Sequence, residues 1–241
     1  MRGAHSHERA LFGDYMKLSV LMPVHNEVRT VADITERVLA VPLDQEVVVV
    51  DDGSSDGTSE AVDQLVSSRV KVIHHPVNRG KGAAVRTALE AATGDVIVIQ
   101  DADLEYDPSD FTRLVVPIVE GRTDIVYGVR SLASQTRIMR WGNRFVTWVT
   151  NLLYGQDLQD METCYKMMPR ELALSLDLEC RGFDLEAEIT AKLLRAGRAI
   201  HELPISYTAR YENKKLSPLD GLPTLRALWR YRRWKPYQSG M

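Results

Sequence analysis

Two aspartates separated by one residue, Asp101-Ala102-Asp103, follow a short apolar run in this 241-residue chain. Carboxylate oxygens at this spacing can bind one hard cation, and Mg²⁺ and Mn²⁺ often share such ligands with a substrate diphosphate. An Asp-x-Asp motif alone is a weak signal, because Asp is also common in turns. However, two acids beside a buried apolar strand repel each other unless a cation or hydrogen-bond donors compensate. The motif therefore favours a divalent-metal site over a plain turn.

Two further polar clusters follow apolar runs earlier in the chain, at Pro23–Glu27 and at Asp51–Gly57. Turn and helix-cap formation explains Ser54–Gly57 as well as a ligand-binding role does. In open α/β sheets, ligands bind at the carboxyl ends of the strands. We therefore expect all three clusters to meet at one edge of a sheet. They would hold a nucleotide with its base near the first two clusters and its diphosphate at the metal.

The elements that position these clusters alternate between strand and helix patterns. Apolar and β-branched runs predict strands at Lys17–Met22, Glu46–Val50, Val70–Ile73, Val96–Ile99 and Ile125–Tyr127. Helical spacing predicts helices at Val31–Ala40, Thr58–Val66, Gly82–Ala92 and Asp110–Glu120, the last opened by Pro108. This alternation with short loops predicts an α/β domain whose mostly parallel central sheet is flanked by helices.

The pattern changes after Gly128. The second half predicts strands at Thr163–Met168 and Ala199–Ile205, and helical segments at Thr136–Tyr154, Phe183–Arg195 and Leu219–Trp234. With no internal repeat or low-complexity linker, the change indicates a functional division inside one domain. We expect an N-terminal arm over residues 1–16 and one domain over 17–241, divided near residue 130.

Composition excludes several classes of protein. The chain is 44% hydrophobic and 26% charged, with a net charge of −3, which argues against disorder and against general attraction to nucleic acid. Two cysteines imply no disulfide framework and suggest a reducing compartment. No segment has the roughly 20 apolar residues of a membrane-spanning helix, and the N-terminus lacks a signal-peptide core.

Two common nucleotide-binding motifs are missing from the sequence. No G-x-G-x-x-G follows the first strand, and no G-x-x-x-x-G-K-[ST] occurs anywhere. Asn78–Gly82 resembles a phosphate loop, but its spacing is wrong. Two readings fit this segment equally well: a loop that leads into a helix, or a flexible backbone packed against the nucleotide. Dehydrogenases and P-loop kinases are therefore disfavoured.

Taken together, these motifs resemble the family 2 glycosyltransferases. The resemblance rests on PVHNE, VVVVDDGSSDGT, NRGKGAAVRTAL and GDVIVIQDADLEYDP, and later on DMETCYKMMPREL, FDLEAEITAKLLRAG and ELPISYTARYENKKLSPLDG. It spans residues 17–230 and is strongest for the branch that makes polyprenyl-phosphate sugars, the dolichol-phosphate mannose synthase-like enzymes. It implies the GT-A fold and an inverting metal-dependent hexosyltransferase. Residues 17–241 would be its single catalytic domain, with residues 17–130 binding the nucleotide sugar and residues 131–241 the acceptor. We expect the chain to be the catalytic unit alone.

The resemblance also implies roles for individual positions. It places the nucleotide sugar against Pro23, His25, Asn26, Glu27, Asp52, Lys81, Asp101, Ala102 and Asp103. It places Mg²⁺ or Mn²⁺ on Asp101, Asp103 and Glu105, and the donor diphosphate or acceptor phosphate on Arg130, Arg140, Arg210, Lys214 and Lys215. His25 stands where the family usually has Tyr or Phe, which leaves the preferred base open.

The acceptor decides whether a catalytic base is needed. A hydroxyl acceptor needs one, whereas a phosphate monoester already carries about −1.5 to −2 charge and needs cations to hold it. Breaking the sugar–diphosphate bond builds negative charge on the leaving group, which a metal ion and basic side chains stabilise. The resemblance therefore implies Asp101, Asp103 and Arg130 as the catalytic set. Asp160 is the candidate base, with a structural cap or salt bridge as its alternative.

Two basic, aromatic segments suggest membrane contact. Trp141, Phe145, Trp148 and Leu152 repeat at helical spacing, beside a strip formed by Arg137, Arg140 and Arg144. This helix either packs on the core or lies in a lipid interface. The tail Leu225–Tyr237 has five basic and four aromatic residues. Both segments fit an enzyme at the cytoplasmic face of a membrane, and homo-oligomer formation would use the same aromatics.

We therefore expect transfer of a hexose from a UDP-glucose or GDP-mannose type of donor to a polyprenyl phosphate. The enzyme would be peripheral to the cytoplasmic membrane, reaching its lipid directly or through a separate membrane protein, with no nucleic-acid partner. A saccharide or other hydroxyl acceptor is the alternative. A non-catalytic nucleotide-sugar-binding protein is the third hypothesis, which the intact acidic motifs disfavour.

Overall fold

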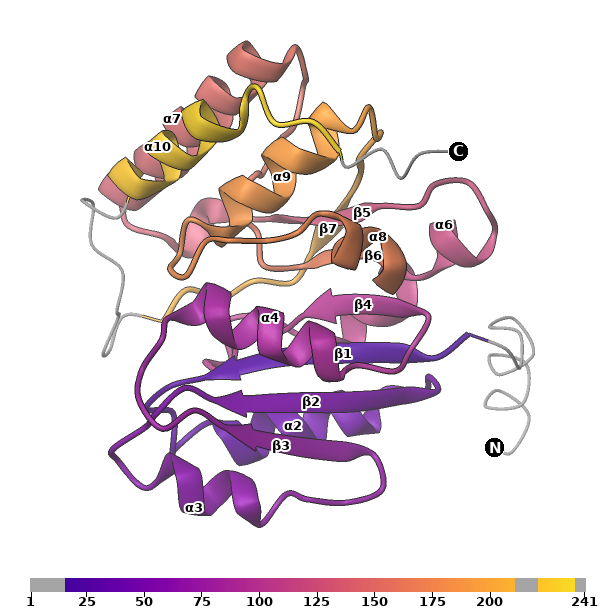
Figure 1. The fold of residues 1–241 in the computed structure, drawn as a ribbon, viewed down its shortest axis with the longest axis vertical. Helices are drawn as coiled ribbons and strands as arrows, with labels where there is room; N and C mark the ends of the chain where they lie inside the picture. The colour runs from indigo at the N-terminus through magenta and orange to yellow at the C-terminus, as the bar shows by residue number, and fades with distance from the viewer. Residues whose placement is uncertain (1–15, 211–220, 237–241) are drawn as a thin grey trace.

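A computed structural model describes residues 16–210 and 221–236, and seven strands among them form one sheet (Figure 1). The strands are β1 (Leu18–Val24), β2 (Gln45–Asp51), β3 (Val70–His74), β4 (Val96–Ile99), β5 (Val126–Arg130), β6 (Lys166–Pro169) and β7 (His201–Ile205). Their order is β3-β2-β1-β4-β6-β5-β7. The predicted N-terminal arm, except Met16, and the expected ligands Lys214 and Lys215 lie outside the described residues.

The sheet is mostly parallel, as predicted. β1 pairs in parallel with β2 and β4, β2 with β3, and β5 with β7, whereas β6 runs antiparallel to β4 and β5. The continuous apolar run Val47–Val50 is completely buried, because helices cover both faces of the central strands. Parallel pairing brings the carboxyl ends of β1 and β2 to the same edge, where the polar clusters follow.

Helices cover both faces of the sheet (Figure 1). They are α2 (Val31–Ala40), α3 (Thr58–Asp63), α4 (Lys81–Ala91), α5 (Phe111–Leu114), α6 (Val116–Val119), α7 (Arg137–Tyr154), α8 (Arg170–Ser175), α9 (Leu185–Arg195) and α10 (Gly221–Tyr231). Apolar residues of α2 and α5 pack on one face, and those of α4, α8 and α9 on the other. A third cluster joins α7, α9 and α10, which lie together at the upper end in Figure 1.

Some predicted boundaries were wrong. The single helix expected over Asp110–Glu120 is divided into a 3₁₀ turn, Pro108–Asp110, followed by α5 and α6. Pro117 explains the interruption, since it has no N–H to donate and its ring crowds the preceding turn. The strand expected from Thr163 begins only at Lys166, and α8 was not predicted. None of the described helices is long and apolar enough to cross a membrane.

Candidate active site

A cavity of about 410 Å³ opens where β1, β2, β4 and β5 end. The cavity brings together most of the residues singled out from the sequence. Those that line it are Pro23, His25, Glu27, Asp52, Lys81, Asp101, Ala102, Asp103, Glu105, Arg130 and Arg210. Asn26, Arg140 and Asp160 are not part of its lining.

Asp52 organises the part of the cavity nearest β1 and β2. Its Oδ1 lies 2.6 Å from Nδ1 of the buried His75 and accepts the backbone N–H of Arg79 at 2.9 Å. Its Oδ2 accepts the N–H of Gly80 at 2.7 Å. The expected hydrogen bond from a nucleobase would therefore add to a carboxylate that already holds the Arg79–Gly80 backbone in place.

The Asn78–Gly82 segment packs against residues 180–182, which belong to the second half of the chain. A Cβ atom at Gly80 or Gly82 would collide with the backbone carbonyl oxygens of Arg181 and Cys180 respectively. Gly80 also has a φ of +92°, a conformation that side chains other than hydrogen disfavour. Glycine is thus required for close packing against residues 180–182, and this loop borders the cavity with its backbone.

Lys81 links the Asp-x-Asp motif to α9. Its Nζ lies 2.8 Å from Oδ1 of Asp101 and 2.7 Å from Oε1 of Glu186, and all three side chains are largely buried. Burial alone would lower the pKa of Lys81, but the two carboxylates raise it well above its ordinary value. The ammonium is therefore charged at neutral pH and fixes the orientation of Asp101.

Asp103 is held in an unfavourable electrostatic environment. Burial, followed by repulsion from Asp101 and Glu105, raises its pKa to about 7. Within residues 16–210 and 221–236, no three His, Cys, Asp or Glu side chains could hold a metal ion by themselves. Mg²⁺, however, is commonly bound by one or two carboxylates together with substrate phosphates. Asp101 and Asp103 fit such a site, since a cation between them would relieve the repulsion that raises the pKa of Asp103.

Glu105 holds the segment after β7 against the Asp-x-Asp loop. Its Oε1 accepts the backbone N–H of Arg210 at 2.7 Å, and its Oε2 accepts the hydroxyl of Tyr207 at 2.7 Å. The Arg210 guanidinium in turn binds Glu27 at the other side of the cavity. Glu105, expected as a further metal ligand, is thus placed as a tether between two loops.

Arg130 and Asp160 form a buried ion pair. Nε of Arg130 donates to Oδ2 of Asp160 at 2.7 Å and Nη2 donates to Oδ1 at 2.8 Å, with side-chain exposures of 8% and 3%. The Arg130 backbone N–H also donates to Oδ2 of Asp160. This is the salt bridge that the sequence left as the alternative to a catalytic base at Asp160. Arg130 still borders the cavity, and its guanidinium lies over the Tyr207 ring.

The sequence reasoning missed several residues of the cavity wall: Tyr106, Gln135, Met139, Asn143, Glu162, Phe183, Glu186 and Tyr207. Glu162 differs from the others because its Oε1 is covered and accepts no hydrogen bond from a described residue. A signal was available, since Glu162 is the only acid in the segment Met161–Met168. No comparable local signal marks Met139 or Asn143, which line the cavity through the placement of α7.

One side of α7 lines the cavity, while another side is exposed and apolar. Ile138, Trp141, Phe145, Trp148 and Leu152 on this outer face are 51–73% exposed. The helix buries Val146, Thr147 and Thr150 instead. Of the two alternatives for the aromatic face, packing on the core is therefore wrong. Large exposed apolar patches mark interaction surfaces.

Arg140 does not extend from this exposed face towards a ligand. Its guanidinium donates to the backbone carbonyl oxygens of Leu132, Ala133 and Gln135. It therefore fixes the loop between β5 and α7, a local structural role. Arg137 and Arg144 are the exposed members of the strip.

The sequence is similar to known glycosyltransferases. Residues 19–173 match the family model for glycosyl transferase family 2. The chain is 30% identical over 195 residues to glycosyltransferase AglJ of Haloferax volcanii, covering 79% of this chain and 63% of that protein. The chain thus spans under two thirds of the length of this relative. It is 28% identical over 211 residues to the undecaprenyl-phosphate mannosyltransferase of Micrococcus luteus, covering 81% of this chain and 85% of that protein.

Solved structures show the same fold. Glucosyl-3-phosphoglycerate synthase from Mycobacterium tuberculosis, in complex with Mn²⁺, UDP-glucose and phosphoglyceric acid, superposes with a TM-score of 0.76 at 22% sequence identity. The match covers 98% of this chain and 86% of that chain. This similarity confirms the predicted GT-A-like arrangement of a mostly parallel sheet with flanking helices.

Proposed function

This chain belongs to glycosyl transferase family 2, and from that premise we propose that it transfers a hexose from a nucleoside-diphosphate sugar to a polyprenyl phosphate. One observation carries the proposal. A single cavity extends from Asp101 and Asp103 to Met139 and Asn143 on α7, whose outer face is exposed and apolar. The named activity of the relative from Micrococcus luteus, an undecaprenyl-phosphate mannosyltransferase, supports this acceptor class.

The donor lies along the edge formed by the strand ends. All five residues of the proposed donor site line the cavity: Pro23, His25 and Asp52 would border the nucleoside, and Asp101 and Asp103 the diphosphate. These two carboxylates would hold Mg²⁺ or Mn²⁺, which neutralises the negative charge that develops on the leaving diphosphate. The Mn²⁺ and UDP-glucose in the structurally similar synthase support this reading of the motif.

The acceptor phosphate is the nucleophile. One of its oxygens attacks C1 of the sugar from the face opposite the diphosphate, the C1–O bond to the diphosphate breaks, and the configuration at C1 inverts. A phosphate monoester needs no deprotonation at neutral pH, since it already carries about −1.5 to −2 charge. The buried pairing of Asp160 with Arg130 is consistent with chemistry that needs no general base.

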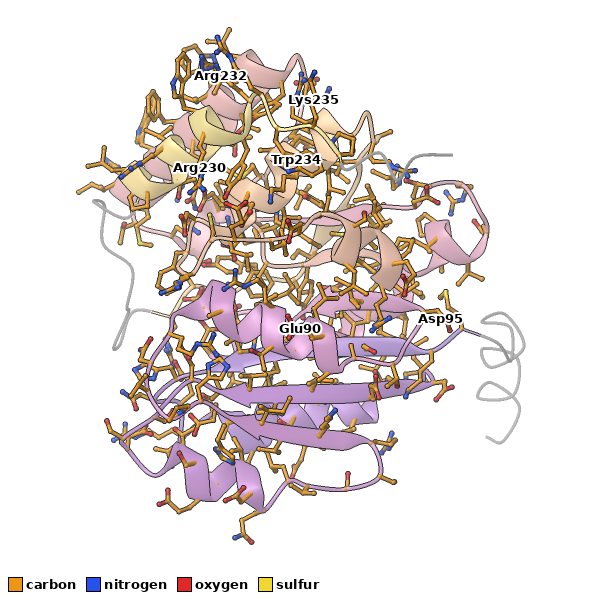
Figure 2. All side chains as sticks on the ribbon, viewed as in Figure 1. Glu90, Asp95, Arg230, Arg232, Trp234 and Lys235 are labelled. Carbon is orange, nitrogen blue, oxygen red and sulfur yellow. The ribbon has the colours of Figure 1, made fainter. Side chains whose placement is uncertain are left out.

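The exposed apolar face of α7 supports an enzyme that works at a membrane surface. Trp229 of α10 is 58% exposed, and α10 packs beside α7 through a 2.7 Å hydrogen bond from Tyr154 to the carbonyl of Leu228. Figure 2 shows Arg230, Arg232 and Lys235 near this end of the molecule, and Glu90 and Asp95 on the other half. Basic residues beside exposed aromatics suit the anionic cytoplasmic face of a bilayer.

Product analysis tests the proposed function. The protein is incubated with labelled UDP-glucose or GDP-mannose, undecaprenyl phosphate or dolichyl phosphate in vesicles, and Mg²⁺ or Mn²⁺. We expect label in a solvent-extractable, acid-labile sugar lipid, and no transfer when a chelator is in excess. Label found only on a saccharide hydroxyl or on free sugar would instead identify the hydroxyl-acceptor alternative. Full transfer in excess chelator would contradict the metal role.

A further inference from the structure

Contacts in the cavity connect the Asp-x-Asp motif to a second pair of acids. Lys81 bridges Asp101 and Glu186. Of the charged neighbours of Glu162, Glu186 has the largest effect on its pKa. Glu186 and Glu162 both border the cavity, so the wall continues from the motif through Lys81 to two carboxyl groups. These two carboxyl groups therefore lie next to the expected diphosphate site, on the far side of Lys81 from Asp101.

Glu162 has an unmet hydrogen-bonding capacity. Its Oε1 is covered from solvent and accepts no hydrogen bond from any residue that the structure describes. Burial, with repulsion from Glu186 as the next cause, raises the pKa of Glu162 to about 7. Covering a carboxyl oxygen without a partner is unfavourable, so such groups in native proteins call for an explanation.

Other buried acids show what a structural role looks like here. Asp160 is paired with Arg130. Glu188 binds Lys192 at 2.7 Å and accepts the backbone N–H groups of Glu179 and Cys180. Both carboxylates have partners on both oxygens. Among the described residues Glu162 has no such partner for its Oε1, and it lines a cavity, which points to a partner bound in that cavity.

The surroundings restrict that partner to an uncharged group. An anion such as phosphate would be repelled by Glu162 and Glu186 together. The positive charge nearby comes from the chain itself, since Arg130 and Lys166 act on Glu162 and Lys81 already binds Glu186. A hydroxyl group both donates and accepts hydrogen bonds, so it can satisfy a carboxyl group in either protonation state.

We propose that Glu162 is a recognition residue for the transferred sugar, binding one of its hydroxyl groups through its carboxyl group, with Glu186 held beside it by Lys81. The inference rests on the proposed function, because the sugar is that of the nucleotide donor. Two parts of the cavity wall then bind two different parts of the donor. The Asp-x-Asp motif binds the diphosphate, and the Glu162 region distinguishes a sugar nucleotide from the bare nucleotide.

Binding measurements separate this proposal from a structural role. Calorimetry with Mn²⁺ compares UDP-glucose with UDP and GDP-mannose with GDP for the wild type, Glu162→Ala and Glu162→Gln. Glu90→Gln is the control, since Glu90 is an exposed acid on α4, away from the site (Figure 2). We expect Glu162→Ala to weaken the sugar nucleotide about tenfold, leaving the bare nucleotide within about twofold. Glu162→Gln, which keeps a hydrogen-bonding carbonyl, should retain more affinity than Glu162→Ala.

The possible outcomes distinguish the inference from the proposed function. If Glu162→Ala and Glu162→Gln bind sugar nucleotides as tightly as the wild type does, the recognition role is wrong and the transferase proposal stands. Equal weakening of sugar nucleotide and bare nucleotide also overturns the role, since it indicates a structural defect. If the wild type binds none of the four ligands, both proposals fail. Thermal unfolding identifies a variant that does not fold, and the remaining one then decides.

Discussion

The guanidinium of Arg210 binds the carboxylate of Glu27 through two hydrogen bonds of 2.8 Å, joining residues 183 positions apart in the chain. The pair spans the cavity, because Glu27 follows β1 and Arg210 follows β7. The backbone N–H of Arg210 also donates to Oε1 of Glu105. Two loops from opposite ends of the sequence are thereby held at a fixed separation over the ligand site.

A double-mutant cycle on this pair measures its contribution. We expect Glu27→Gln and Arg210→Gln each to lower the free energy of unfolding by about 1 kcal/mol, with a clear coupling energy between them. Arg37→Gln is the control, since Arg37 forms an exposed pair with Asp33. Chemical denaturation gives the values, and strict additivity of the two changes would show that the pair contributes nothing.

Asp103→Asn tests the metal-binding role without disturbing the fold. Replacing the carboxylate should reduce transfer on the order of 10²-fold or more, because charge stabilisation at the leaving group is lost. The thermal midpoint without metal should not fall, since the variant removes the repulsion that raises the pKa of Asp103. A steady-state transfer assay beside a thermal scan provides both readings. Wild-type activity in the variant would be incompatible with the proposed site.

Asp160→Asn separates a structural ion pair from a catalytic base. Arg130 would remain buried without its counter-charge, so we expect a loss of about 3 kcal/mol in the free energy of unfolding. Glu171→Gln is the matched control, because Glu171 also pairs with an arginine, Arg170, but its side chain is 84% exposed. Urea unfolding of both variants measures the effect. A stable Asp160→Asn protein that has lost only catalysis would favour the base instead.

The buried carboxyl of Glu162 makes stability depend on pH in a defined direction. Its pKa is raised from 4.5 to about 7, so the folded state retains a proton that the unfolded chain loses. This contribution is fully present below pH 4.5 and is lost as the pH rises through 7. Glu162→Gln removes it, so the variant should gain about 2 kcal/mol over the wild type between pH 5 and pH 8. Unfolding curves at both pH values test this, and a pH-independent difference would contradict it.

The exposed face of α7 predicts binding to anionic bilayers. Trp141→Glu combined with Trp148→Glu should abolish most co-sedimentation with vesicles that contain phosphatidylglycerol, because a charge replaces each interfacial ring. Val66→Glu changes an equally exposed apolar residue that lies just after α3, and it should leave binding intact. The double variant should still bind nucleotide sugars. Undiminished vesicle binding would assign this face to another partner.

The outline of the fold could be predicted because local patterns carry it. The run Val47–Val50 is apolar at every position, as a strand covered on both faces requires. The helix over Val31–Ala40 matched its prediction at both ends. The interruption at Pro117 was also visible locally, but the apolar spacing on both sides of it masked the break.

The candidate site was predictable only where its residues are close in sequence. Asp101 and Asp103 form a motif on one loop directly after an apolar run, so their local sequence context indicates shared chemistry. The pairing of Glu27 with Arg210 depends on how β7 is placed in the sheet, which one sequence does not show. The same limit applies to α7: periodicity predicts an aromatic face, whereas its exposure depends on the packing of α9 and α10 against Val146.

The two-sided character of α7 has a kinetic consequence. A helix is about 10 Å across, so a cavity on one side and a bilayer on the other would be separated by little more than one helix. The acceptor would reach the site by lateral diffusion within the membrane plane, while the donor arrives from bulk water. Turnover would then follow the mole fraction of acceptor in the membrane, and adding inert lipid at constant total acceptor would slow the reaction by surface dilution.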